Sequence, residues 1–397
     1  MDRDSLAKLL TREGLALLDT VEIDNRADVV KTVSSLRAQG HDAGLVAAVL
    51  SQAKLRNRGK AKFGAFAEGM LLTEDGLEQA SRLQVSALHA GRFRNAGLDH
   101  IADLGCGIGT ESLAMAAIGL TVTAVELDEV TAACATYNLA AFQNVEVIQA
   151  DVTAIDMNQF DGLFFDPARR ELGTGRGSSS RKFDPAQFSP NYDWVLEQAK
   201  LKPTGIKLGP GHPHEAIPSG CEAQWVSVNG DLVELGLWFG PLARAGVARS
   251  ALLIKDGEAV EIKSEKFEST QAPVRDMGKY LYEPDNSVVR SHLIAELAAE
   301  FNLGLIAPEI AYLTGDEAVY SPWLRGFEVL EEMAFDRKKL KARLRELGIG
   351  ILEIKKRGSD VVPETLRKEL QLKGERAATL IVTRVGDSHR ALLASAL

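Results

Sequence analysis

The sequence predicts an α/β protein built around a parallel, doubly wound sheet of the Rossmann-like kind. From His100 onward, short strand-type runs such as "IADLG" and "TVTAVEL" alternate with helix-type runs such as "TESLAMAAIG", and this βαβ rhythm predicts right-handed crossovers between parallel strands. The first run leads into a loop with three glycines, and four successive runs end in an acidic residue. Since ligands bind at the carboxyl ends of the strands in such sheets, we expect a site there.

We expect four parts along the chain. Residues 1–95 have a helix-type spacing of leucines, which predicts an N-terminal helical region. Residues 96–265 predict the doubly wound sheet, with short runs after Gly220 forming an antiparallel addition at its edge. Residues 266–319 are a connecting segment of mixed character. Residues 320–397 alternate strand-type and helix-type runs, which predicts a small C-terminal α+β domain.

The composition is that of an ordinary soluble protein, with 45% hydrophobic and 25% charged residues in a chain of 397. This length allows two or three domains. The first ten residues lack the basic start and apolar run of a secretory signal, and no apolar stretch approaches the roughly 18 residues of a membrane helix. Three cysteines do not make a disulfide framework. We therefore expect a cytoplasmic protein that does not bind membranes.

Charge is distributed unevenly along the chain. The net charge is −9, but residues 320–397 hold 16 Lys and Arg against 11 Asp and Glu, a balance of +5 that leaves −14 for the rest. A basic end on an acidic body indicates a separate module. A second basic run, "QAKLRNRGKAKFG", has two interpretations: a solvated basic surface, which we favour, or a patch that contacts phosphates.

The glycine-rich loop "DLGCGIGTE" follows the first predicted strand. Glycines at 105, 107 and 109 let the backbone turn tightly and approach a ligand closely. The dinucleotide fingerprint would place its third glycine at position 110, where this chain has Thr110. Asp103 opens the loop, and its carboxylate would repel a pyrophosphate and suit a ligand with an ammonium or sulfonium group.

Two further acids stand at the ends of the next two predicted strands. Glu126 closes the second strand, in "AVELD", where a carboxylate accepts hydrogen bonds from both hydroxyls of a ribose. Asp151 follows the third strand, in "QADV", where it can accept a hydrogen bond from an adenine amine. Together these residues predict a pocket for adenosine without a phosphate site.

The motifs "DLGCGIGT", "AVELD", "QADV" and "FFDPARR", in this order, resemble the first four motifs of class I S-adenosylmethionine-dependent methyltransferases. The resemblance covers roughly residues 100–260, and its alternatives are an NAD-type Rossmann domain or an unrelated α/β core. It implies that the cofactor is S-adenosyl-L-methionine. In the positions that match, it assigns the methionine part to Asp103, Gly105, Gly107 and Gly109, the ribose to Glu126, the adenine amine to Asp151, and the adenine ring to Leu127 and Val152.

The fourth motif implies the acceptor side of the site. Methyltransferases that act on amino groups of nucleic acids often carry Asn/Asp-Pro-Pro and then an aromatic residue here, and the aromatic ring stacks on a flipped-out base. Asp166 and Pro167 match this pattern, whereas Ala168 and Arg169 depart from it. An arginine can also stack on a base or bind phosphate. We therefore take Asp166, Pro167 and Arg169 as the candidate catalytic residues.

The cysteines indicate the type of reaction. Methylation of a pyrimidine C5 normally needs a cysteine nucleophile near the acceptor, and none of the three cysteines is well placed for this in the sequence. We therefore expect direct in-line transfer to a nitrogen or oxygen, with Asp166 orienting or deprotonating the acceptor. The loop "RRELGTGRGSSSRK" that follows has two interpretations, a basic lid or an ordinary crossover loop.

The C-terminal segment, residues 320–397, resembles the THUMP-like domain of one group of bacterial methyltransferases. THUMP domains accompany RNA-modifying enzymes, so the resemblance implies an RNA-handling role. Its basic residues, from Lys338 to Arg345 and from Lys355 to Arg357, are compatible with RNA contacts or with a solvated surface. His212 and His214 have no partners at metal-ligand spacing, so we expect no metal site.

These observations predict an S-adenosylmethionine-dependent methyltransferase that modifies a base nitrogen of RNA, in tRNA or rRNA. The acidic body and the incomplete fourth motif leave two alternatives. One is a methyltransferase for a small molecule or a protein. The other is a non-catalytic protein that binds S-adenosylmethionine and scaffolds RNA.

Overall fold

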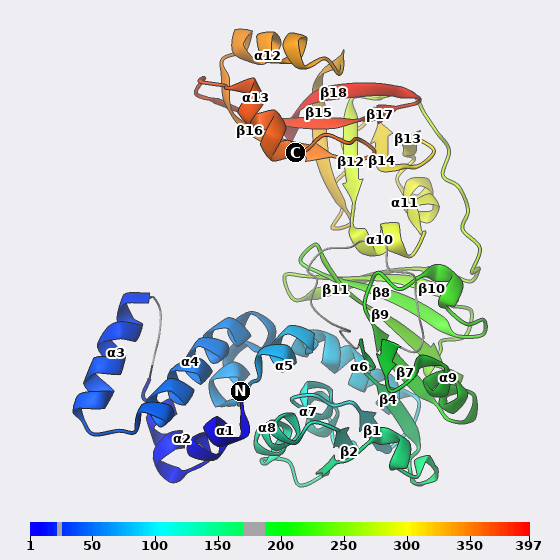
Figure 1. The fold of residues 1–397 in the computed structure, drawn as a ribbon. Coiled ribbons are helices and arrows are strands. Elements are labelled where there is room, and N and C mark those ends of the chain that lie inside the picture. The colour runs from blue at the N-terminus through cyan, green and yellow to red at the C-terminus, as the bar shows by residue number, and fades with distance from the viewer. Residues whose placement is uncertain (22–25, 170–186) are drawn as a thin grey trace. The chain divides into compact units, whose positions relative to one another are not determined.

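The computed structural model describes residues 1–21, 26–169 and 187–397 of the chain, which folds into two compact units (Figure 1). The first unit contains Met1–Leu208, His212–Cys221 and Leu237–Arg244. The second unit contains Gly209–Gly211, Glu222–Gly236 and Ala245–Leu397.

The first unit begins with helices, as the leucine spacing predicts. They are α1 (Arg3–Leu9), α2 (Arg12–Leu18), α3 (Arg26–Ala38), α4 (Ala43–Phe63), the 3₁₀ helix η1 (Gly64–Gly69), α5 (Glu74–Gln79) and α6 (Leu83–Asn95). Four of them start where the sequence supplies a side-chain oxygen for a free backbone N–H. These N-caps are Asp2, Thr11, Asp42 and Thr73. Leucines and other apolar side chains from α1, α2 and α4 form one buried cluster.

The first unit also holds the parallel sheet that the sequence predicts. Its strands are β1 (His100–Leu104), β2 (Thr121–Glu126), β3 (Val145–Gln149), β4 (Gly162–Phe165) and β7 (Thr204–Leu208). They lie in the order β7-β4-β1-β2-β3, and every pair is parallel. The crossover helices are α7 (Thr110–Ala117), α8 (Glu129–Leu139) and α9 (Tyr192–Leu201). Since β2 and β4 lie on opposite sides of β1, the order reverses at β1, and ligands bind at such a switch point.

Short elements complete this unit. They are the 3₁₀ helices η2 (Val152–Ala154), η3 (Met157–Gln159), η5 (His214–Ala216) and η6 (Gly240–Leu242), and the two-residue strands β5 (Ala168–Arg169) and β6 (Phe188–Ser189). β5 and β6 pair in antiparallel fashion just after the end of β4. Strand β9 (Asp231–Phe239) is divided between the two units at Gly236.

In the second unit, β8 (Glu222–Val228), β10 (Arg249–Lys255) and β11 (Glu258–Ser264) form adjacent strands. β10 pairs in parallel with β8 and in antiparallel fashion with β11. The prediction of an antiparallel addition is therefore wrong for β8 and β10. Short turns between apolar runs suggested hairpins, but β9 lies between β8 and β10 in the chain, so these two strands can run in the same direction.

A seven-stranded, mostly antiparallel sheet occupies the C-terminal part of the second unit. In spatial order it contains β13 (Gly304–Ala307), β14 (Ile310–Gly315), β12 (Tyr280–Pro284), β15 (Leu324–Ala334), β18 (Ser388–Ala396), β17 (Arg376–Val385) and β16 (Ile349–Lys356). Only β16 and β17 are parallel among its pairs. The helices of this part are α10 (Asn286–Arg290), α11 (Ile294–Glu300), α12 (Arg337–Glu346) and α13 (Pro363–Leu370). Leucines of α12 and α13 pack with those of β16 and β17 in one core, which confirms the predicted α+β character of this part. Strands β12, β13 and β14 of the same sheet come from residues 266–319, the predicted connecting segment.

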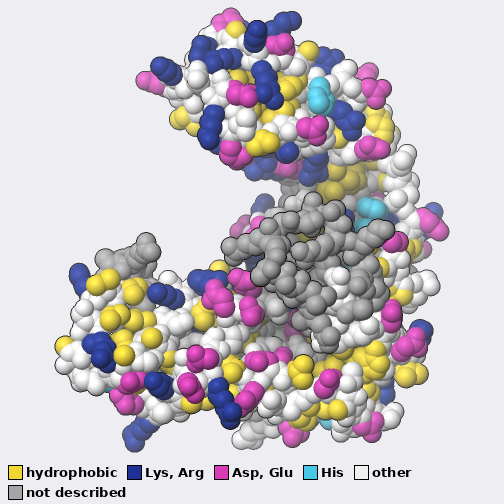
Figure 2. Space-filling model, viewed as in Figure 1, with side chains coloured by type: hydrophobic (Ala, Val, Ile, Leu, Met, Phe, Trp, Pro, Cys, Tyr) yellow, Lys and Arg dark blue, Asp and Glu magenta, His cyan; other side chains and the backbone are white. Residues whose placement is uncertain are grey.

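The surface of this C-terminal part carries both signs of charge. Figure 2 shows Lys and Arg side chains lying among Asp and Glu side chains on its visible face. None of the helices in the described part of the chain combines the length and apolar composition that a membrane-spanning helix requires.

Candidate functional site

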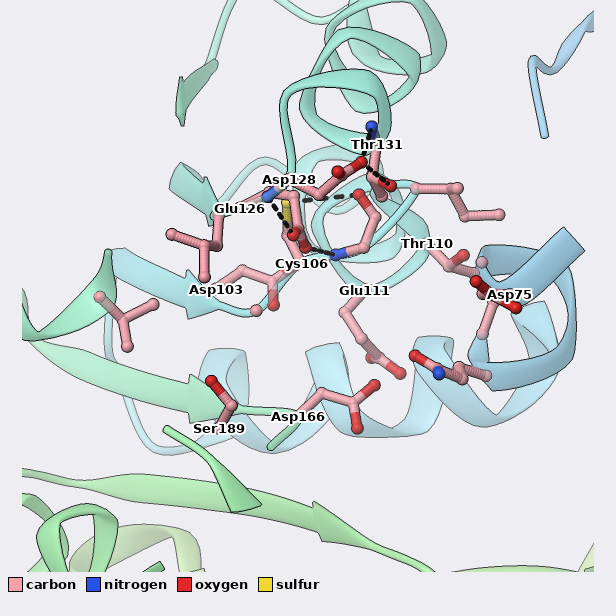
Figure 3. A pocket seen from close by; sticks show the side chains of 18 of the residues that line it. Asp75, Asp103, Cys106, Thr110, Glu111, Glu126, Asp128, Thr131, Asp166 and Ser189 are labelled. Atoms are coloured by element: carbon pink, nitrogen blue, oxygen red, sulfur yellow. Dashed lines mark hydrogen bonds between the residues drawn. The ribbon is translucent and has the colours of Figure 1, made fainter. Parts of the chain in front are cut away.

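A cavity of about 490 Å³ lies at the carboxyl ends of the parallel strands of the first unit (Figure 3). Its size is that of a typical small-molecule site. Every residue in its lining belongs to the first unit. The lining consists of Asp75, Gly76, Gln79, Ala80, Ser81, Asp103, Gly105, Cys106, Gly107, Ile108, Thr110, Glu111, Glu126, Leu127, Asp128, Glu129, Thr131, Asp151, Val152, Asp166, Ser189, Pro190 and Lys207.

The glycine loop between β1 and α7 forms the floor of this cavity. Gly105 has φ +89°, and a Cβ atom there would lie 3.1 Å from the backbone oxygen of Asp166. Only glycine meets both requirements without strain, because L side chains rarely adopt this φ and the space is closed by backbone. The backbone N–H groups of Gly105 and Cys106 donate to the oxygen of Val125 on β2, which fixes the loop between two strands.

Glu126 lies at the end of β2, and backbone donors hold its carboxylate. Oε2 accepts a hydrogen bond from the Gly107 N–H at 3.0 Å, and Oε1 accepts one from the Asp128 N–H at 2.9 Å. Asp128 in turn caps α8 by accepting from the Thr131 N–H at 2.8 Å. Backbone groups thus orient the carboxylate in the cavity lining, and both donors lie no more than 19 residues from Glu126 in the sequence.

Asp151 and Val152 line the cavity beside β3. Asp151 Oδ1 accepts hydrogen bonds from the backbone N–H and the hydroxyl of Thr153, at 2.9 and 2.7 Å. Val152 is buried, whereas Leu127, which also lines the cavity, is 59% exposed. Apolar side chains next to a fixed carboxylate can receive an aromatic ring that bears an amino group.

Asp103 is completely buried at the end of β1. Ser112 donates a hydrogen bond to its Oδ2 at 2.5 Å, while Oδ1 has no hydrogen-bond partner among the described residues. Burial raises the pKa of this carboxyl to about 7, although the hydrogen bond from Ser112 opposes the shift. A buried oxygen without a donor, in the lining of a cavity, is suited to an ammonium group of a ligand.

Asp166 follows β4 and faces the cavity (Figure 3). The Nζ of Lys207, on β7, donates to its Oδ2 at 2.6 Å. The two side chains are 28% and 11% exposed, so this ion pair is largely shielded from water. Lys207 also donates to the backbone oxygen of Gln79 at 2.8 Å. Lys207 was not among the predicted site residues, although its position near the carboxyl end of a predicted strand, "GIKLGPG", indicates the edge of the sheet where ligands bind.

A buried acid, Glu111, also lines the cavity near this pair. Glu111, on α7, accepts hydrogen bonds from the hydroxyl of Ser86 at 3.0 Å and from Nδ1 of His89 at 3.2 Å. Burial acts to raise the pKa of Glu111, but His89, Lys207 and a hydrogen bond from Ser81 together lower it below its usual value. Glu111 and Asp166 point toward the same space in Figure 3. No motif predicted the contact between Glu111 and His89, because Ser86 and His89 lie in a helix outside the motifs.

The wall opposite the sheet comes from α5 and the residues after it. Lys62 of α4 donates to the backbone oxygens of Leu77, Glu78 and Ala80, at 2.8, 2.7 and 2.7 Å. Burial lowers the pKa of Lys62 to about 8. A Cβ atom at Gly76 would lie 2.5 Å from the side chain of Ile108, so α5 packs directly on the glycine loop.

Neighbouring cations of α4 also make intramolecular contacts. Arg56 is buried and donates to the oxygen of Met70 at 2.8 Å, Arg58 pairs with Glu74, and Lys60 pairs with Glu68. The basic run in the sequence therefore serves largely to attach the segment that leads into α5. The favoured interpretation, a solvated surface, fits Arg58 and Lys60, whose side chains are about half exposed, but not Arg56, which is buried.

Several other predicted residues lie elsewhere. Pro167 is buried and Gly109 is the N-cap residue of α7, and neither lines the cavity. The backbone of Arg169 lies in β5, but its side chain and the loop 170–186 are outside the described residues. His212 is buried with its ring 5.2 Å from that of Tyr192.

A cysteine nucleophile and a metal ion are two reactive groups that such a cavity can contain. Of the three cysteines, Cys106 lines the cavity, and burial raises the pKa of its thiol, so it is a poor nucleophile at neutral pH. Among the described residues, no group of three or more His, Cys, Asp or Glu side chains is arranged to hold a metal ion.

Comparison with known families divides the chain into three segments. The family described as "Methyltransferase small domain" matches residues 66–174, which include α5 and β1 to β4. The family "THUMP domain-like" matches residues 324–396. A domain of unknown function matches residues 2–59.

Two curated relatives and one solved structure match most of the chain. The relatives, from Mycobacterium tuberculosis strains CDC 1551 / Oshkosh and ATCC 25618 / H37Rv, are each 33% identical over 341 residues, which is 84% of this chain and 91% of the relative. Both are named uncharacterized S-adenosylmethionine-dependent methyltransferases. A crystal structure of a candidate methyltransferase from Porphyromonas gingivalis W83 has a TM-score of 0.69 and 19% identity, covering 94% of this chain and 99% of that chain. This last likeness concerns the fold.

Proposed function

This chain belongs to the S-adenosylmethionine-dependent methyltransferases, and we propose that it transfers the methyl group to a nitrogen of an RNA base, in tRNA or rRNA, by direct in-line displacement. The observation that carries the acceptor part is Asp166, which follows β4, faces the cavity and is followed by Pro167. A carboxylate there can accept a hydrogen bond from the amine that receives the methyl group.

The residues around the cavity fit S-adenosylmethionine. Asp103 offers a buried oxygen that has no donor among the described residues, which suits the ammonium of the methionine part. Glu126, held by backbone N–H groups, would accept from the ribose hydroxyls. Asp151 would accept a hydrogen bond from the adenine amine. Leu127 and Val152 would contact the adenine ring. The cofactor supplies a methyl group activated by a sulfonium.

The residues of the chain would then act by placement. The acceptor nitrogen contributes the electron pair of the new bond, the electron pair of the carbon–sulfur bond stays on sulfur, and the proton lost from the nitrogen passes to the Asp166 carboxylate, which would release it to water. Asp166 would hold that nitrogen in line by its hydrogen bond. Direct transfer is supported by Cys106, the cysteine of the lining, because burial raises the pKa of its thiol.

The support for RNA as the acceptor is the match of residues 324–396 to the THUMP domain-like family. The positive charge of this segment adds less support. Several cations of α12 are engaged within the domain: Arg337 pairs with Glu369, Arg343 pairs with Glu331, and Lys341 donates to the oxygen of Glu369. Contacts of this kind reduce the charge available to phosphates.

A second candidate is a methyltransferase for an amine of a small molecule or a protein. The observation that favours it is the lining of the cavity, where the described residues include eight acids and a single cation, Lys207. Such a lining attracts positively charged ligands and repels phosphates.

The two candidates are separated by one labelling experiment. The purified enzyme is incubated with S-adenosylmethionine that carries a labelled methyl group, together with total RNA from a strain that lacks the gene. Parallel reactions contain the protein fraction and the small-molecule fraction of the same strain. We expect label in RNA that nuclease digestion assigns to a base. Label confined to the protein or small-molecule fraction would overturn the RNA proposal and favour the second candidate.

A further inference from the structure

Lys207 joins three parts of the first unit. It stands on β7, its Nζ is 2.6 Å from Oδ2 of Asp166 after β4, and it is 2.8 Å from the backbone oxygen of Gln79 at the end of α5. Its side chain is 11% exposed. These contacts connect residues that are 41 and 128 positions apart, so the pair is a product of the tertiary fold.

The charge of Lys207 matters because of what surrounds Asp166. The charged groups near it are Asp103 from β1, Glu111 from α7, Lys207 from β7 and Lys62 from α4. Lys62 already donates to three backbone oxygens, and Glu111 is paired with His89. Among the contacts that the described residues show, Lys207 is the cation that touches the Asp166 carboxylate directly. Removing one member of a shielded pair takes away its compensation of the other charge.

We infer that Lys207 is a positioning residue for methyl transfer, which holds Asp166 ionised and aimed at the acceptor. The inference rests on the function proposed above. Lys207 also ties the end of α5 to this carboxylate, so the wall and the acceptor group keep their relative position.

The test compares Lys207→Met, which keeps most of the side-chain volume, with Lys207→Arg, which keeps the charge. Lys200→Met is the matched control, because Lys200 is an exposed residue of α9 in the same unit, paired only on the surface with Glu197. Cofactor affinity is measured by calorimetry. Methyl transfer is measured, as a function of pH, on whichever fraction of the deletion strain takes up label.

We expect Lys207→Met to lower kcat/KM for methyl transfer by about 100-fold, with the dissociation constant of S-adenosylmethionine changed by less than about threefold. The acid limb of the pH profile should move upward, because loss of the positive charge of Lys207 makes the Asp166 carboxylate easier to protonate, and a protonated carboxyl no longer accepts the hydrogen bond. Lys207→Arg should return the acid limb to its wild-type position, and Lys200→Met should behave as wild type.

Two results would overturn the inference. One is a Lys207→Met profile with its acid limb unmoved. The other is a loss of cofactor affinity as large as the loss of transfer, which would indicate a purely structural role. A ¹³C titration of the Asp166 carboxyl, assigned by its absence in Asp166→Asn, gives the same answer without an acceptor: its midpoint should rise in Lys207→Met and not in Lys207→Arg. If label enters only protein or small molecules, the RNA proposal fails, while the Lys207 test is completed on that fraction.

Discussion

The carboxylates at the two ends of the cavity, the cofactor end and the acceptor end, are oriented by different kinds of contact. At the cofactor end, Glu126 is fixed by backbone N–H groups 19 and 2 residues away, and Asp151 by Thr153, 2 residues away. At the acceptor end, Asp166 is paired with Lys207, 41 residues away. The cofactor end is therefore assembled by strand ends and turns, whereas the acceptor end depends on side chains that only the fold brings together.

The difference has a physical basis. A carboxylate that accepts backbone hydrogen bonds is oriented as soon as the strand and turn form. A carboxylate paired with a lysine or a histidine from another element is oriented only after packing excludes water, since exposed ion pairs contribute little. We therefore expect changes at the acceptor end to alter transfer, and changes at the cofactor end to alter binding.

The largest effect is expected for Asp166→Ala. Without the carboxylate, the acceptor amine loses its hydrogen-bond acceptor, and transfer should fall by about 1,000-fold or more. Cofactor affinity should stay within about threefold, as measured by calorimetry. If Asp166→Ala lost cofactor affinity to the same extent as transfer, the two ends of the cavity would not have the separate roles described above.

A smaller effect is expected for Glu126→Ala, and it should concern cofactor binding rather than methyl transfer. Hydrogen bonds to a charged group contribute about 1.5–3 kcal/mol each, so losing those to the ribose should weaken cofactor binding by about 100-fold. The rate at saturating cofactor should change much less. The control is Glu146→Ala, an exposed acid on the neighbouring strand β3. Unchanged cofactor affinity in Glu126→Ala would contradict the ribose assignment.

The pH dependence of cofactor binding sharpens the assignment of Asp103. Burial raises the pKa of its carboxyl to about 7, so below pH 7 the group is protonated and cannot pair with an ammonium. If it binds the ammonium, the dissociation constant of S-adenosylmethionine should fall about tenfold between pH 6 and pH 8. Asp103→Asn should show no such dependence. The comparison is made by calorimetry at constant ionic strength.

The smallest effect is expected for Lys62→Met. The lysine fixes three backbone oxygens at the end of α5, so its loss should loosen the wall of the cavity and reduce kcat/KM for transfer by about fivefold, on the scale of one hydrogen bond. Lys60→Met is the control, because Lys60 lies on the same helix and pairs with Glu68 at the surface. Equal effects of the two substitutions would mean that the hydrogen bonds to α5 have no special role.

The sequence alone determined the α/β class, the order of the parallel strands along the chain, the glycine loop, the acid at each strand end and the C-terminal module. These features depend on residue spacing and on local backbone requirements, such as the positive φ at Gly105, so they can be read within a few residues. The segment after Gly220 shows the limit, because apolar runs and short turns do not specify which strands pair.

Only the tertiary structure decided what surrounds Asp166. The pairs Asp166–Lys207 and Glu111–His89, and the lysine that holds the end of α5, join residues 41, 22 and 15 to 18 positions apart across different elements. It also decided that Arg56 and Lys62 of the basic run donate hydrogen bonds to backbone oxygens inside the molecule. A charged side chain has no partner until packing supplies one, and the energy of that pairing depends on burial, which a sequence pattern does not contain.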